Sequence, residues 1–175
     1  GEYAKHLLEN NFKVFGIDPD KKNSSSFTLY GGILFNNIND LLEKSNVIIL
    51  SLPTVPIFHN VINEIENCNS FTDPKIIIDM NTISLEDKLD AKNKLEKLNI
   101  FFIDAPVSGT GAQAKTKDLV VMSSGSEKII NDCKDIFDSF ARKNIFVGEF
   151  GNGIKFKILA NLLVTVHNTV TAEAL

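Results

Sequence analysis

The sequence has 175 residues, of which 43% are hydrophobic and 23% charged, a balance that is ordinary for a globular domain with a sizeable core. The formal net charge of −4 and the isoelectric point near 5.4 argue against a dedicated nucleic-acid-binding protein, which would normally carry a basic face. No apolar run is long enough to span a bilayer, and the first residues do not resemble a signal peptide, so we expect no membrane partner.

Strand and helix patterns alternate along the chain. Short apolar or β-branched runs predict strands at 13–17, 46–52, 75–79, 100–104, 119–123 and 144–147, with a short strand or turn near 33–35. Helical patterns lie at 1–9, 38–44, 56–66, 84–98, 126–142 and 151–175, whereas the stretches 21–26 and 105–114 read as loops. This alternation predicts an α/β fold, a Rossmann-like doubly wound sheet with parallel strands, which binds ligands at the carboxyl ends of its strands.

The last helical stretch carries an unusual polar line on an apolar background. Its apolar residues recur on a wide face, as expected of a helix buried against other elements. Lys157, Asn161 and Asn168 are spaced so that they fall on one side of that helix. A lysine of this kind either extends into solvent from the edge of the helix or lies in a pocket, where it can gain or lose a proton near neutral pH. The residues of this helix alone leave both interpretations open.

The two cysteines, Cys68 and Cys133, match no metal-binding or redox spacing. We therefore expect free thiols and no metal site. Free thiols are typical of a reducing compartment, so we expect the cytoplasm, with the mitochondrial matrix as the alternative.

Two motifs in the second half of the chain resemble those of one enzyme family. Residues 104–109 read Asp-Ala-Pro-Val-Ser-Gly, and Gly151-x-Gly153-x-x-x-Lys157-x-x-x-Asn161 follows at a distance. Both motifs, in this order, resemble the 3-hydroxyisobutyrate dehydrogenases, also called the β-hydroxyacid dehydrogenases. The resemblance runs through the whole chain.

The resemblance implies a role for each residue that matches a motif position. Lys157 corresponds to the catalytic general acid/base, and Asn161 to an asparagine that helps to place the substrate. Ser108 and Gly109 correspond to the loop that holds the substrate carboxylate through hydroxyl and backbone N–H donors; without the flanking match they would read as a plain turn. Thr110 takes the place of the family's usual second glycine, so the substrate pocket differs and the particular hydroxyacid stays open.

The resemblance also implies a nicotinamide cofactor. Leu52, Pro53, Asn81 and Thr82 correspond to positions that line it, with Asn81 standing where serine is commoner. Oxidation of an alcohol needs a hydride acceptor, which a nicotinamide supplies, and a base for the hydroxyl proton, which a neutral lysine amine can provide.

One carboxylate bears on the choice between NAD and NADP. Asp18 follows the strand at 13–17, where a carboxylate usually binds the adenosine ribose hydroxyls and would repel the extra phosphate of NADP. In NADP-preferring relatives an arginine tends to follow this point, whereas Pro19 follows here. We therefore predict NAD, with NADP as the alternative.

The same resemblance predicts the domain organisation. Residues 1–148 correspond to a dinucleotide-binding domain that lacks its first strand and Gly-rich loop. Residues 149–175 correspond to the start of a long interdomain helix, and we expect the all-helical C-terminal domain to be missing. We expect the full-length form to be a homo-oligomer.

The leading hypothesis is therefore an NAD(P)-dependent dehydrogenase or reductase acting on a small β-hydroxyacid. One alternative of a different class is a truncated, non-catalytic relative that serves as a binding or dimerisation module through its C-terminal helix. A decarboxylating phosphogluconate-type dehydrogenase is a further alternative, which the shorter form of the loop motif disfavours.

Overall fold

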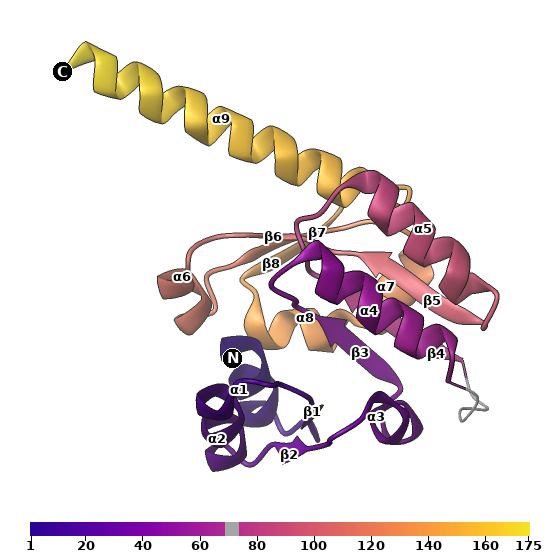
Figure 1. Ribbon diagram of the computed structural model, residues 1–175. Helices are drawn as coiled ribbons and strands as arrows, with labels where there is room; N and C mark the ends of the chain where they lie inside the picture. The colour runs from indigo at the N-terminus through magenta and orange to yellow at the C-terminus, as the bar shows by residue number, and fades with distance from the viewer. Residues whose placement is uncertain (69–73) are drawn as a thin grey trace.

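A parallel three-stranded sheet lies at the centre of the computed structural model, which describes residues 1–68 and 74–175 (Figure 1). Its strands are β3 (Val47–Leu50), β4 (Lys75–Asp79) and β5 (Ile100–Asp104), in the order β3-β4-β5. Each reads as a nearly continuous β-branched or aromatic run, as expected of strands covered on both faces. The crossover helices α4 (Val55–Glu66) and α5 (Leu85–Glu96) follow β3 and β4.

Successive residues of the central strands alternate between two hydrophobic cores. Ile77 of β4 and Phe102 of β5 pack with side chains of α4 and α5. The next residues along the strands, Ile78 and Ile103, pack in a second core with side chains of α7 (Glu127–Asp132) and α8 (Lys134–Phe140). Helices therefore cover both faces of the sheet, with α4 and α5 in front and α8 behind in Figure 1, and the predicted α/β doubly wound class is confirmed.

The N-terminal part contributes a two-stranded parallel sheet of β1 (Phe15–Gly16) and β2 (Ile33–Leu34). Three helices accompany these strands: α1 (Glu2–Glu9), α2 (Lys21–Leu29) and α3 (Ile38–Lys44). Tyr3 of α1 contacts Phe140 of α8, with 5.1 Å between the ring centroids. This contact fixes the first helix to the body of the chain.

A third sheet differs from the expectation of parallel strands throughout. It consists of β6 (Val107–Ser108), β7 (Val120–Ser123) and β8 (Lys143–Phe146); β6 is antiparallel to β7, and β8 is parallel to it. The stretch predicted as a loop at 105–114 contains β6 and the start of the one-turn helix α6 (Gly111–Lys115). Because α6 is too short to act as a crossover, the chain returns beside β6 in the opposite direction.

The predicted loop at 21–26 is wrong, because these residues begin helix α2. The carboxylate of Asp20 accepts hydrogen bonds from the backbone N–H groups of Lys22 and Asn23, which caps the helix. Phe27 is its buried side chain, and the other residues face outward. A helix at the edge of the molecule needs little apolar surface, and its composition therefore looked like that of a loop.

The predicted helix at 126–142 is two helices, α7 and α8, which are separated at Cys133. The backbone N–H of Cys133 is shared between the carbonyl oxygens of Ile129 and Ile130, as is usual where a helix tightens at its end. Both Cys68 and Cys133 are buried and unpaired, and burial raises the pKa of the Cys133 thiol to about 11.

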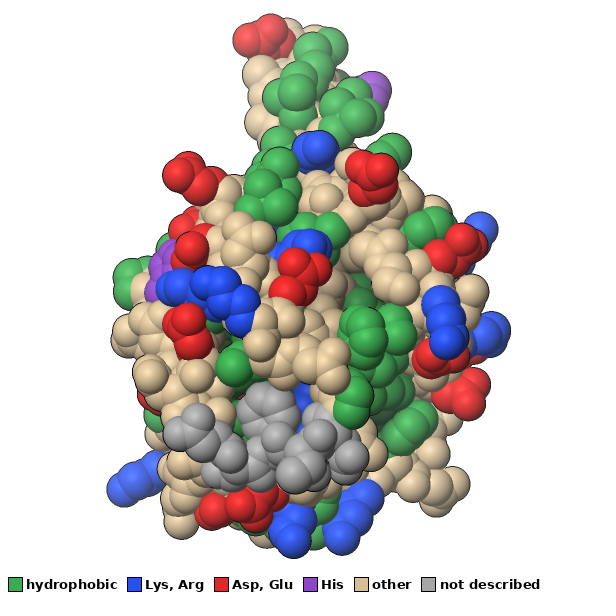
Figure 2. All heavy atoms as spheres, turned by 90° about the vertical axis from the view of Figure 1, so that its right-hand side faces the viewer, with side chains coloured by type: hydrophobic (Ala, Val, Ile, Leu, Met, Phe, Trp, Pro, Cys, Tyr) green, Lys and Arg blue, Asp and Glu red, His purple; other side chains and the backbone are tan. Residues whose placement is uncertain are grey.

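Helix α9 (Asn152–Ala174) begins against the body and then projects away from it (Figure 1). Its predicted helical state is confirmed, but the expected burial holds only at its start, where Gly153 and Ile154 are buried. Figure 2 shows the hydrophobic side chains exposed along the projection. In the described parts of the chain, no helix combines the length and apolarity needed to cross a membrane.

Replacement of Phe58 by alanine tests the first core. Because the ring is fully buried, we expect Phe58→Ala to lower the free energy of unfolding by about 3–5 kcal/mol. The neighbouring Ile57 is 40% exposed, and Ile57→Ala should cost less than about 1 kcal/mol. Urea unfolding followed by circular dichroism measures both; equal losses would contradict the described packing.

Candidate active site

Two carboxylates lie side by side at the carboxyl edge of the central sheet. Asp79 ends β4 and Asp104 ends β5, and the two are partners in the parallel register. Lys88 of α5 lies between them, with its Nζ 2.5 Å from Asp79 Oδ2 and 2.9 Å from Asp104 Oδ1. All three side chains are fully buried. Burial raises the pKa of the Asp79 carboxyl, while the Lys88 ammonium and the N–H donors of Asn81 act in the opposite direction.

Asp104 also joins the two sequence motifs. It opens the first motif, and its Oδ2 accepts a hydrogen bond from the backbone N–H of Ile154, inside the second, at 2.9 Å. The same oxygen accepts from the hydroxyl of Ser124 at 3.0 Å. The Ser124 oxygen in turn accepts from the backbone N–H groups of Gly151 and Gly153. One carboxylate and one hydroxyl thus satisfy the otherwise free N–H groups at the start of α9.

The local backbone geometry explains why glycine occupies both positions of the second motif. Gly151 has φ +90°, which favours glycine. A Cβ at Gly153 would lie 2.5 Å from the carbonyl oxygen of Met122 and 2.8 Å from Asp104 Oδ2. The helix can approach the strand ends this closely because position 153 has no side chain.

Lys157 lies three residues beyond Ile154, on the next turn of α9, and its side chain is half-buried. Partial burial lowers the pKa of its amine below the usual lysine value. Asn161 follows one turn later and is exposed, as is Asn168. Among the ion pairs of the described residues, none involves Lys157, so partial burial is the cause of its lowered pKa.

The predicted substrate loop follows Asp104 directly. Ser108 is half-buried in β6, and Gly109 has φ +140°, which only glycine adopts readily. Thr110 caps α6: its backbone N–H donates to Gln113 Oε1 at 2.9 Å, and its hydroxyl oxygen accepts from the Gln113 N–H. The polar groups of Thr110 are thus used within the loop, which leaves Ser108 and Gly109 as the better donors.

The predicted cofactor residues at 52–53 and 81–82 are brought together at the neighbouring strand ends. Asn81 is buried, and its Oδ1 accepts a hydrogen bond from the Leu52 N–H at 2.6 Å. Its backbone N–H and its Nδ2 both donate to Asp79 Oδ1. Pro53 and Thr82 are exposed beside this link. Asn81 therefore holds Leu52 in position, while Pro53 and Thr82 are accessible to a ligand.

Asp18 lies apart from this cluster, beyond β1. Its Oδ1 accepts a hydrogen bond from the Asp20 N–H at 2.9 Å, and its side chain is exposed. Its other carboxylate oxygen, Oδ2, makes no hydrogen bond within the described residues. An exposed carboxylate with a free oxygen fits a ribose diol, so the residues present are compatible with the predicted dinucleotide.

Sequence reasoning missed Lys88 and Ser124. Lys88 shares a helical face with the buried Ala91 and Leu95, and this spacing is a signal that could have identified it. Ser124 follows a predicted strand, and nothing in its immediate sequence marks it.

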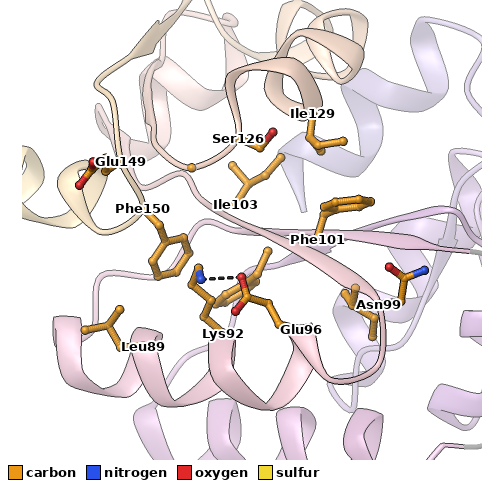
Figure 3. A pocket seen from close by; sticks show the side chains of 13 residues that line it. Leu89, Lys92, Glu96, Asn99, Phe101, Ile103, Ser126, Ile129, Glu149 and Phe150 are labelled. Carbon is orange, nitrogen blue, oxygen red and sulfur yellow. Dashed lines mark hydrogen bonds and ion pairs between the residues drawn. The ribbon is translucent and has the colours of Figure 1, made fainter.

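A cavity of about 510 Å³ lies elsewhere, between α5, β5 and the start of α7 (Figure 3). Its walls include Leu89, Phe101, Ile129 and Phe150, and the Lys92–Glu96 ion pair borders it. None of the predicted site residues lines this cavity, which reaches toward the amino end of β5.

The comparisons with known proteins agree with the α/β fold. Residues 1–148 match the family described as the NAD binding domain of 6-phosphogluconate dehydrogenase. The chain belongs to this family. NAD is therefore the cofactor of its family. The predicted resemblance to the 3-hydroxyisobutyrate dehydrogenases is confirmed by relatives of that name and by a similar solved structure.

Three similar proteins illustrate the family. The 2-(hydroxymethyl)glutarate dehydrogenase of Eubacterium barkeri is 27% identical over 98% of this chain and 58% of its own length. The L-threonate dehydrogenase of Pectobacterium atrosepticum is 36% identical over 57% of this chain and 33% of its own. A solved 3-hydroxyisobutyrate dehydrogenase of Mycobacterium tuberculosis, with L-serine, is 25% identical with a TM-score of 0.93, over 99% of this chain and 59% of that one.

The chain thus spans little more than half the length of the relatives that it matches from end to end. The predicted division at 148/149 and the roles of individual residues stay predictions, because they concern features that a match of this kind does not test.

Replacement of Gly153 by alanine tests the close approach of α9 to the strand ends. Because the added methyl would meet two carbonyl oxygens and a carboxylate, we expect Gly153→Ala to cost about 1–3 kcal/mol of unfolding free energy. A Cβ at Gly111 would meet only open space, and Gly111→Ala should change the free energy of unfolding by less than about 1 kcal/mol. Chemical unfolding of the two variants checks this; a Gly153→Ala protein as stable as wild type would be incompatible with the described contact.

Proposed function

We propose that this chain is the cofactor-binding part of an NAD-dependent dehydrogenase or reductase of small β-hydroxyacids. The 3-hydroxyisobutyrate dehydrogenase-like and 2-hydroxy-3-oxopropionate reductase-like reactions are the two forms that we consider. In this proposal residues 1–148 bind the dinucleotide, and 149–175 begin an interdomain helix. The observation that carries it is the hydrogen bond from the Ile154 N–H to Asp104, which brings the substrate-loop motif and the lysine motif to one point.

The chemistry assigned to the chain follows from that arrangement. The nicotinamide, when bound, supplies the hydride acceptor. Ser108, through its hydroxyl, and Gly109, through its backbone N–H, bind the substrate carboxylate. The Lys157 amine takes the proton of the substrate hydroxyl, and Asn161 orients that hydroxyl. In the reverse direction the Lys157 ammonium gives the proton back.

The environment of Lys157 supports its role as a base. A solvated lysine is almost entirely protonated at neutral pH and accepts protons poorly. Partial burial disfavours the charged ammonium and lowers the pKa of this amine. A bound substrate and cofactor would exclude more water and act in the same direction.

The relatives support the substrate class. The names of the 2-(hydroxymethyl)glutarate, L-threonate and 3-hydroxyisobutyrate dehydrogenases each denote oxidation of a hydroxyacid. The non-catalytic alternative is not favoured, because these matches are to proteins named as enzymes. The particular hydroxyacid is not assigned, since Thr110 replaces a glycine in the loop that would contact it.

Removal of the Lys157 amine tests the assignment of the base. In the complete protein, Lys157→Ala should lower kcat by about 100-fold or more, because proton transfer is lost. The Kd for NAD should change by less than about threefold, because the lesion spares the cofactor contacts. Nicotinamide absorbance with a panel of hydroxyacids measures turnover, and calorimetry measures binding. Turnover like that of wild type would remove Lys157 from the mechanism.

The pH dependence gives a second test of the same amine. Oxidation needs the neutral amine, so kcat/KM for the hydroxyacid should rise with pH through the pKa of Lys157, below the usual lysine value. Reduction needs the ammonium, so its kcat/KM should fall through the same pKa. Lys157→Arg keeps the positive charge but cannot lose the proton near neutral pH. The rise of kcat/KM with pH in the oxidation direction should therefore disappear in this variant. A rise of kcat/KM with pH that persists in Lys157→Arg would belong to another titrating group and would contradict the assignment of Lys157.

Asp18 is expected to set the preference for NAD. Asp18→Asn removes the charge that would repel the 2′-phosphate of NADP, so the ratio of kcat/KM for NAD to that for NADP should fall by about tenfold or more. Asp40 is an exposed carboxylate of α3, and Asp40→Asn is the matched control that should leave the ratio unchanged. An unchanged ratio in Asp18→Asn would show that Asp18 does not discriminate between the ribose of NAD and that of NADP.

A further inference from the structure

Lys88 is a buried lysine for which the proposed chemistry has no use. Its side chain is 0% exposed, and its ammonium lies between Asp79 and Asp104. Burial of a charged group is costly unless partners compensate it, so a lysine in this place needs a strong local reason.

The reason lies in the register of the sheet. Asp79 and Asp104 occupy partner positions on neighbouring parallel strands, whose backbones lie about 4.8 Å apart. Two carboxylates this close and fully buried repel each other strongly. The Lys88 ammonium lies within hydrogen-bond distance of both and offsets this repulsion.

One arm of the cluster extends to the loop after β3. Asp79 accepts two hydrogen bonds from Asn81, through the backbone N–H and Nδ2. Asn81 in turn accepts from the Leu52 N–H. Displacement of the Asp79 carboxylate would therefore also displace Leu52, which lies in the segment proposed to line the nicotinamide.

The other arm extends to the start of α9. Asp104 accepts from the Ile154 N–H and from Ser124, whose oxygen accepts from Gly151 and Gly153. Lys157 follows on the next turn of this helix. The backbone of the β4–β5 ladder joins the two arms, as in the hydrogen bond from the Ala105 N–H to the Asp79 carbonyl oxygen at 2.9 Å. Among the side-chain hydrogen bonds and ion pairs of residues 1–68 and 74–175, they are joined only through the Asp79–Lys88–Asp104 bridge.

We infer that Lys88 is a positioning residue of the active site, whose ammonium holds the cofactor loop after β3 and the lysine-bearing helix α9 at a fixed separation. It acts through Asp79 and Asp104 and contacts neither substrate nor cofactor. The inference rests on the proposed function, because that function defines what is positioned. It adds a residue outside both motifs to the machinery.

A double variant isolates the bridge. Lys88→Met alone would leave two neighbouring buried carboxylates without a cation and would risk misfolding. The combination of Lys88→Met with Asp79→Asn leaves one carboxylate, so the net charge of the cluster stays at −1, as in wild type with two carboxylates and one ammonium. The amide oxygen that Asp79→Asn introduces can still accept from Asn81, while Asp104 Oδ1 loses its contact with the Lys88 ammonium.

Two readouts follow from the inference. With the complete protein, kcat per NAD-binding site should fall by about 100-fold, because small displacements of reacting groups have effects of that size. KM for the hydroxyacid should stay within about threefold. Independently of turnover, hydrogen exchange at the amides of Leu52 and Ile154 should accelerate together by about tenfold.

Lys75 provides a matched control. It is also buried and lies on β4, at the opposite end from Asp79, with its Nζ 3.4 Å from Asn46 Oδ1. Lys75→Met should leave kcat per site and both exchange rates near those of wild type.

The outcomes separate this inference from the proposed function. If the complete protein oxidises no hydroxyacid, the proposed function fails, and the exchange data alone decide whether Lys88 couples the two segments. Unchanged kcat per site would overturn the inference, as would faster exchange at only one of the two amides. Loss of cooperative unfolding in the double variant would also overturn it, since Lys88 would then serve the fold as a whole.

Discussion

The contact of one buried ammonium with two carboxylates determines how the carboxyl edge of this sheet is built. Asp79 and Asp104 end adjacent parallel strands at the same level, and this register would be unfavourable without Lys88 between them. The remaining oxygens of the carboxylates are satisfied by N–H and O–H donors from three different segments. Such a cluster is rigid, because within the described residues the buried Asp104 Oδ1 has only the ion pair with Lys88, and displacement of Lys88 would leave it uncompensated.

This rigidity explains how loops far apart in sequence come to form one site. The proposed substrate loop begins at Asp104, and the first turn of helix α9 is bound to the same carboxylate through the Ile154 N–H. Gly153 allows the helix to approach, and Lys157 follows one turn later, where partial burial lowers the pKa of its amine. The proposed base is thus carried by a regular helix, and its position depends on hydrogen bonds at the first turn of that helix.

Much of the fold could be predicted because the buried strands carry a clear signal. The runs at 46–52, 75–79 and 100–104 gave the central sheet, and the Gly-x-Gly spacing gave the start of α9. Helix α2 was missed because an edge helix buries only Phe27 and otherwise looks like a loop. The motifs identified the loops and the lysine, but not Lys88 or Ser124, because these residues join segments that only the fold brings together.

In the proposed function, Lys157 faces the alcohol of a hydroxyacid whose carboxylate is held by Ser108 and Gly109. A crystal structure of the complete protein with NAD and a bound hydroxyacid tests it most directly. We expect Lys157 Nζ within about 3.2 Å of the substrate hydroxyl, and the substrate carboxylate at the Ser108 hydroxyl. A substrate bound elsewhere, with the Lys157 amine in bulk solvent, would contradict it.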